Sequence, residues 1–229
     1  MMIDLYCERT ASGLMNEPLN TLSNIMFLVA ALIAWRAVQA RGGRDTLETV
    51  LITLAASIGI GSTLFHMFAN HATELADVIP IWSFVALYIA TVIYRMTGQN
   101  KARTARIVAI AAVITGTVFY FTSGDVSTDH THAHTAFNGS LQYAPALAAL
   151  VFFSLLTVAK KHPSRGYIVG ATAMFIAALG FRTVDLDMCG AREIGTHFLW
   201  HIFNGGMVAL LLLALIRTLP PLGYAPLAR

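Results

Sequence analysis

Apolar residues fill seven stretches of roughly 20 residues each, and short polar connections separate them. A helix of about 20 apolar residues is long enough to cross the hydrocarbon core of a bilayer. The pattern therefore predicts an all-α integral membrane protein with seven transmembrane helices. Their expected ranges are about 20–40, 47–69, 77–96, 105–122, 141–159, 167–184 and 195–218. A polar segment, residues 1–18, precedes the first helix, and residues 1–229 are expected to form a single domain.

The composition agrees with this class of protein. Charged residues make up 12% of the chain, about half of the ~25% that is usual in soluble domains. The formal net charge of +3 is small, and no basic patch with interleaved aromatic residues occurs, so nucleic acid is not an expected partner. The N-terminus has no basic region followed by an apolar run, which predicts that no signal peptide is cleaved.

Basic residues are divided unevenly between the connections. All but three of the 15 lysines and arginines fall in or beside the first, third and fifth connections and the C-terminal tail. The exceptions are Arg9, Arg182 and Arg192. Cytoplasmic loops are enriched in lysine and arginine, so the pattern predicts an N-terminus outside and a C-terminus in the cytoplasm. We expect a bacterial inner membrane with the outer face toward the periplasm; an intracellular eukaryotic membrane is the alternative.

Polar side chains with regular spacing interrupt the apolar stretches. His197 and His201 are four positions apart in the last stretch, and Ser62 and His66 have the same spacing in the second. Side chains four apart lie on one face of a helix. Asp77 is expected at the head of the third helix. The predicted topology places all five near the outer ends of their helices, at one depth in the membrane, where polar groups are costly unless they have a function.

These residue types favour metal-dependent hydrolysis. Three histidines with one open position are typical of a catalytic zinc, which lowers the pKa of a water molecule to about 7. Asp77 could move the proton of that water, and Ser62 could hydrogen-bond a developing oxyanion. A site within a membrane favours a lipid amide or ester as substrate. Histidines that only pack in the bundle, and a proton relay in a transporter, are the alternatives. The lack of a polar trail toward the cytoplasm disfavours the relay.

The spacing of these residues resembles the signature of a known family. The segments Ser62-x3-His66 and His197-x3-His201, with Asp77 eleven positions after His66, are similar to the three motifs of the alkaline ceramidases. That family belongs to a wider group of seven-helix membrane hydrolases that includes the adiponectin receptors. The resemblance extends over nearly the whole chain.

The resemblance implies an activity and assigns roles. It implies a zinc ion held by His66, His197 and His201, with Asp77 and Ser62 as catalytic partners. The implied reaction is hydrolysis of the amide bond of ceramide to a long-chain base and a fatty acid. A related hydrolase of another lipid amide or ester is one alternative. A membrane receptor or transporter that uses the metal structurally is another.

A second metal follows from the same resemblance. Eukaryotic members of the family bind calcium through acids near the N-terminus, which implies calcium ligation by Glu8, Glu17 and Asp4. The match is partial, because the expected acid falls on Leu5 and the expected asparagine on Thr10. Oxygen ligands in a flexible segment suit Ca²⁺. Solvated acids on an external tail are the alternative.

The two cysteines, Cys7 and Cys189, both fall on the outer side of the predicted topology. That side is an oxidising compartment in bacteria. We therefore expect a disulfide that ties the N-terminal segment to the last outer connection; two buried free thiols are the alternative.

Other polar residues carry weaker expectations. His130, His132 and His134 alternate in a polar connection, where such histidines bind metals only weakly; a lid or a solvated loop is expected there. Arg182 and Asp185 are expected to form an interfacial ion pair. Trp200 could belong to an interfacial aromatic belt or to a pocket wall.

Overall fold

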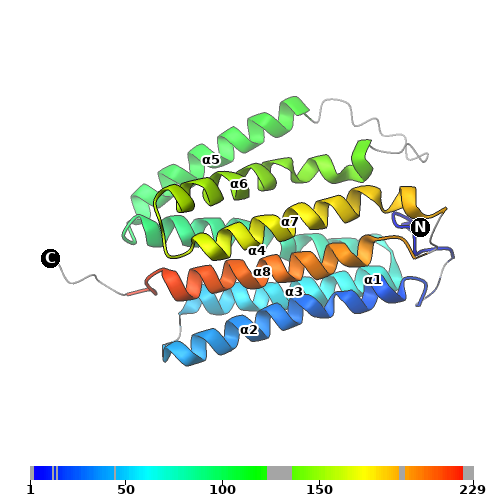
Figure 1. Cartoon of the computed structure of the whole chain (residues 1–229), viewed down its shortest axis with the longest axis horizontal. Coiled ribbons are helices and arrows are strands. Elements are labelled where there is room, and N and C mark those ends of the chain that lie inside the picture. Colours follow the sequence, from blue (N-terminus) through cyan, green and yellow to red (C-terminus); the bar gives the residue numbers. More distant parts are fainter. Residues whose placement is uncertain are drawn as a thin grey trace.

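The protein is a bundle of long helices that lie side by side along its longest axis (Figure 1). A computed structural model describes residues 3–11, 13, 15–43, 45–122, 136–190 and 194–223, and regular structure within these ranges is helical. The elements are α1 (Pro18–Ser23), α2 (Ile25–Arg41), α3 (Thr46–Phe68), α4 (His71–Met96), α5 (Lys101–Thr122), η1 (Ala136–Tyr143), α6 (Ala144–Ala159), α7 (Arg165–Val184), η2 (Leu186–Met188) and α8 (His197–Thr218).

Membrane-spanning character is present in six helices of the described chain. Each of the six is long and apolar enough to cross a bilayer: Pro18–Arg41, Thr46–Phe68, His71–Met96, Phe137–Ala159, Arg165–Val184 and His197–Thr218. Large apolar side chains such as Leu22, Ile79 and Leu155 are more than half exposed, which suits contact with lipid. Helix α5 occupies the place of the expected fourth span. A seventh crossing and the orientation of the bundle stay predictions.

The first and third expected helices begin earlier than the apolar pattern indicates. Helix α4 starts at His71 rather than near residue 77, because Asn70 caps it: the Asn70 side chain accepts hydrogen bonds from the amides of Ala72 and Thr73. Asp77 therefore lies in the second turn of α4 and not at its head. The first span begins with α1 at Pro18, a residue suited to a first helical turn.

Helices α3 and α4 approach each other most closely at Gly61. A Cβ atom at this position would lie 2.0 Å from the backbone oxygen of Ala76. Pro80 explains why this oxygen faces a neighbour: it lacks the N–H that would bond Ala76 within the helix, and its ring pushes against that carbonyl. Glycine therefore allows the two helices to meet where Ser62 and Asp77 face each other's helix.

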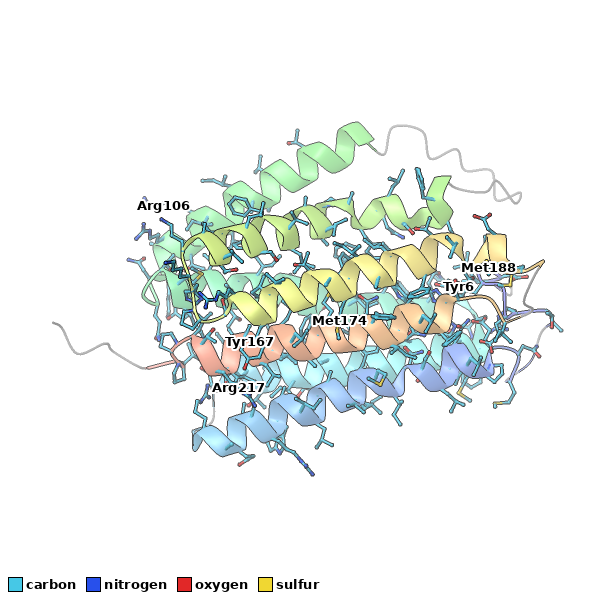
Figure 2. The ribbon with its side chains drawn as sticks, viewed as in Figure 1. Tyr6, Arg106, Tyr167, Met174, Met188 and Arg217 are labelled. Carbon is cyan, nitrogen blue, oxygen red and sulfur yellow. A yellow bond between two sulfur atoms is a disulfide. The ribbon has the colours of Figure 1, made fainter. Side chains whose placement is uncertain are left out.

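The two ends of the bundle have different polar contents. Tyr6 and Met188 lie at the end where α7 finishes and α8 begins, whereas Arg106 and Arg217 lie at the other end (Figure 2). The basic end also holds a buried ion cluster that the sequence did not predict. In it, Arg95 donates to Asp45 at 2.7 Å and to Glu48 at 2.8 Å. Such a pairing compensates the cost of burying a guanidinium group.

Candidate metal centre

Three histidines that are far apart in the sequence come together at the Tyr6 end of the bundle. His66 lies in the last turn of α3, His197 is the first residue of α8, and His201 follows one turn later. One ligand nitrogen from each ring lies within 4.8 Å of those from the other two. All three residues are buried, with exposures of 1%, 1% and 2%. The structure thus brings together the three histidines that the spacing singled out.

Hydrogen bonds at Nδ1 determine which nitrogens face the centre. The Nδ1 atom of His66 is bonded to the Glu17 carboxylate, which can only accept, so this nitrogen carries the proton. The Nδ1 atom of His201 lies 2.8 Å from the Ser23 hydroxyl. Because that hydroxyl already donates to the Asn20 carbonyl, it accepts from His201. As neutral imidazoles, the form that binds metals, both rings would therefore present an Nε2 lone pair to the centre.

These lone pairs fit a shared metal ion better than a hydrogen bond. The Nε2 atoms of His66 and His201 are 3.2 Å apart. Two nitrogens that bind one tetrahedral zinc at about 2.05 Å are expected about 3.3 Å apart. In addition, Nδ1 of His197 is buried without a hydrogen-bond partner among the described residues. One ligand nitrogen of His197 also lies within 4.8 Å of those of the other two rings, so the arrangement fits a cation between the rings.

A cavity of about 40 Å³ opens beside the histidines. That volume has room for water, which needs about 10–15 Å³. Ser62 and Asp77 line it, so the five residues expected at one depth do share one place. The Oδ1 atom of Asp77 is buried and has no hydrogen-bond partner within the described residues. The cavity is also lined by residues whose part in it the sequence did not predict: Tyr6, Tyr143 and Arg182.

The N-terminal segment braces His66 from outside the bundle. Arg9 is buried, forms an ion pair with Glu17 and donates at 2.6 Å to the backbone oxygen of His66. Asn20 donates to the other side of the same carboxylate at 3.0 Å. A carboxylate behind a histidine orients the ring and raises its basicity toward a metal. Sequence reasoning missed this role of Glu17, because no periodic signal marks a segment that folds back over the bundle.

The residues implied as calcium ligands are not gathered into a ligand set. Both oxygens of Glu17 accept from N–H donors, as described above. The Glu8 oxygens accept from the amides of Leu19 and Asn20 at 2.7 and 2.8 Å, and Asp4 is exposed. The only group of three or more potential metal-binding side chains in the described residues is the histidine triad. The N-terminal segment as folded therefore does not fit a calcium ion.

A disulfide between Cys7 and Cys189 confirms the expected cross-link. Asp185 also links the N-terminal segment to the start of α8, since its carboxylate accepts hydrogen bonds from the amides of Cys7, Thr196 and His197 at 2.7–3.0 Å. These bonds secure the start of α8. The predicted ion pair between Arg182 and Asp185 is wrong, because Asp185 faces these backbone amides instead.

Trp200 forms part of the pocket wall, the second of its two expected roles, and its ring stacks with that of His197 at a centroid distance of 6.4 Å. The alternating histidines His130, His132 and His134 lie outside the described residues, so their role stays a prediction.

The fold and the site together define a helical protein with candidate membrane spans and a buried three-histidine centre that could hold a metal ion. The chain belongs to the Ceramidase family, whose model matches residues 4–219. This match confirms the family indicated by the sequence motifs. None of the curated proteins matches the chain. Membership implies a hydrolase that acts on amides, with a lipid substrate.

Proposed function

We propose that the protein is a zinc-dependent intramembrane hydrolase that cleaves the amide bond of ceramide-like lipids, releasing a long-chain base and a fatty acid. The observation that carries this proposal is the pair of Nε2 atoms of His66 and His201, 3.2 Å apart, in a buried triad whose ligand nitrogens all lie within 4.8 Å of one another. Zinc is the metal of choice because imidazole ligands with one open position suit it. Membership of the Ceramidase family supports amide hydrolysis.

The chain's own residues divide the work around the cavity. His66, His197 and His201 would hold the ion, which supplies Lewis acidity to activate water and polarise the amide carbonyl. Asp77, with a free carboxylate oxygen in the cavity, takes the proton of the attacking water and delivers it to the leaving nitrogen. Ser62 donates its hydroxyl hydrogen to the oxygen on which negative charge develops. Glu17 keeps His66 in the tautomer that leaves Nε2 free.

The orientation belongs to the same proposal. We infer that the centre opens toward the non-cytoplasmic face of a bacterial inner membrane, because the basic residues gather at the opposite end. A C-terminal tag should then be cut by protease only in inverted vesicles, whereas cleavage in intact spheroplasts would contradict this orientation.

Metal analysis and a lipid assay test the function together. Purified protein in detergent is loaded with zinc, assayed for metal stoichiometry and incubated with N-acyl sphingosine and a panel of other lipid amides and esters. We expect one zinc per chain and release of fatty acid from the N-acyl sphingosine. If fatty acid is released only from another amide or from an ester, that lipid and not ceramide is the substrate.

Two histidine variants separate the site from the rest of the chain. His197→Ala should lose both zinc and hydrolysis. His162→Ala is the matched control, because His162 contacts Ser164 in the connection between α6 and α7, away from the centre; it should keep both. Hydrolysis that persists in His197→Ala, or its absence from zinc-loaded wild type on every lipid, would refute the proposal.

A further inference from the structure

Four of the described arginines are not exposed, and one of them differs from the others. Arg9 is paired with Glu17, Arg41 with Glu48, and Arg95 with Asp45 and Glu48. Arg182 has no carboxylate within 4.0 Å among the described residues. A guanidinium group away from water is costly unless an anion or a full set of acceptors compensates it.

Aromatic rings surround Arg182 in place of an acid. Its guanidinium carbon lies 5.9 Å from the ring centre of Tyr6, 5.5 Å from that of Tyr143 and 5.3 Å from that of Trp200. Cation–π contacts of this kind hold and orient the group, but they leave its N–H donors unused. Within the described part of the chain, the Nε atom is buried with no hydrogen-bond partner, and Nη1 makes only a long contact of 3.5 Å with the Tyr6 hydroxyl.

Neighbouring groups do not neutralise the guanidinium. Asp185, three positions on, directs its carboxylate at backbone amides, as described above. Asp77 lines the same cavity but forms no ion pair with Arg182 among the described contacts. The cation therefore faces the cavity with spare hydrogen-bond donors.

The guanidinium lies close to the proposed reaction centre. Tyr6 contacts both the guanidinium group and the histidine triad. Its ring stacks on His197 with a centroid distance of 3.7 Å and also lies under Arg182. This step rests on the proposed function, in which the cavity contains two positively charged groups, the divalent cation and Arg182. The carboxylate of Asp77 is the one negatively charged side chain that lines the cavity in the described residues. This excess of positive charge in a site with little water favours a bound anion.

We propose that Arg182 forms an anion-binding subsite for the lipid, which takes an oxyanion close to the amide bond. That oxyanion has two sources: an acidic group on the amine half of the substrate, such as a carboxylate or sulfonate, or the carboxylate of the released fatty acid. A planar guanidinium with free N–H groups matches either one in a bidentate manner. The subsite makes the protein selective for acidic N-acyl lipids, or sensitive to its own product.

Matched ligands distinguish the two sources. N-lauroylglycine and N-lauroylethanolamine differ only by a carboxylate in place of a hydroxymethyl group, and laurate and lauryl alcohol differ in the same way. Hydrolysis of the first pair and thermal stabilisation by the second are measured for wild type, Arg182→Gln, Arg182→Lys and Arg217→Gln. Arg217 is exposed at the opposite end, where it contacts Tyr167, and serves as the control.

Each result assigns a source or overturns the subsite. If the substrate carries the anion, wild type favours N-lauroylglycine in kcat/KM by about tenfold or more, Arg182→Gln loses this preference, and Arg182→Lys keeps part of it. If the product carries it, laurate stabilises wild type more than lauryl alcohol does, and Arg182→Gln abolishes the difference. Wild type that discriminates neither pair, or Arg182→Gln that discriminates as wild type does, overturns the proposal.

Folding and function are controlled separately. The discrimination of wild type itself needs no variant, so a failure of Arg182→Gln to fold leaves the test intact. The stabilisation by laurate needs no turnover. If wild type hydrolyses no lipid, the proposed function fails, while the comparison of laurate with lauryl alcohol still decides on the subsite.

Discussion

The close approach of α3 and α4 at Gly61 gives the sharpest test of how the fold positions the site. In Gly61→Ala the new methyl group would lie 2.0 Å from the Ala76 oxygen, whereas ordinary contacts begin at 3.4 Å. The helices must therefore separate by about 1.4 Å, the difference of these two distances. The obstacle is backbone, which cannot rotate aside as a side chain would.

This separation moves Asp77 away from Ser62 and His66. Misplacing a reacting group by about 1 Å can cost about 10²-fold in rate, so we expect kcat/KM for lipid hydrolysis to fall by about that factor. Overpacking also costs about 1–3 kcal/mol of stability, which lowers the Tm in detergent. The three histidines lie on α3 and α8, so zinc stoichiometry should change less than activity.

Gly180→Ala is the matched control, because a Cβ atom there meets nothing within 4 Å. Alanine has the higher helix propensity, by about 1 kcal/mol, so this variant should be as stable as wild type or more so, with unchanged kcat/KM. If Gly61→Ala shows wild-type activity and Tm, the two helices do not meet at Gly61, and the positioning of Asp77 requires another explanation.

Glu17→Gln removes the charge behind His66 and should weaken zinc binding about 10–100-fold in chelator competition, whereas the half-exposed Glu74→Gln should bind as wild type does. Added CaCl2 should shift the Tm no more than MgCl2 does, because Arg9 already neutralises Glu17; a shift specific to calcium would argue against this reading of the N-terminal segment. Cys189→Ser should lower the free energy of unfolding by about 2–5 kcal/mol, which is measured as a lower Tm. Reductant should lower the Tm of wild type by a similar amount and leave the Tm of the variant unchanged. Arg95→Ala removes the ion-pair partner of the buried Asp45 and one of the two partners of Glu48, and should cost about 3–5 kcal/mol. The zinc stoichiometry should stay that of wild type; loss of zinc would mean that the two ends of the bundle are coupled.

The hydrophobic pattern predicted the long apolar helices, six of which are candidate membrane spans in the described residues, because length and apolar content are local properties of the chain. The histidine triad was also predictable. Residues four positions apart lie on the same face of a helix, and the distribution of basic residues indicates which helix ends lie at the same end of the bundle. The start of α4 was missed because the Asn70 cap adds a polar first turn to an otherwise apolar span. A pattern of apolar residues carries no information about such a turn.

Partners of charged side chains were predicted less well. Glu17 was expected to bind calcium and instead holds His66, and Arg182 was expected to pair with Asp185 and instead faces the cavity. Each choice depends on where the N-terminal segment docks against α3, α7 and α8. That docking depends on contacts between residues far apart in sequence, among them the Cys7–Cys189 bond, so no local pattern reports it.

The order in which the chain is synthesised bears on when it can become active. His66 and His201 lie 135 positions apart, and α8 comes after the other helices of the described residues in the chain. A nascent chain that lacks α8 has one of the three imidazoles and cannot close the coordination shell. On the proposed function, metal loading therefore waits until α8 has been made, which would keep chains that lack α8 from attacking membrane lipids.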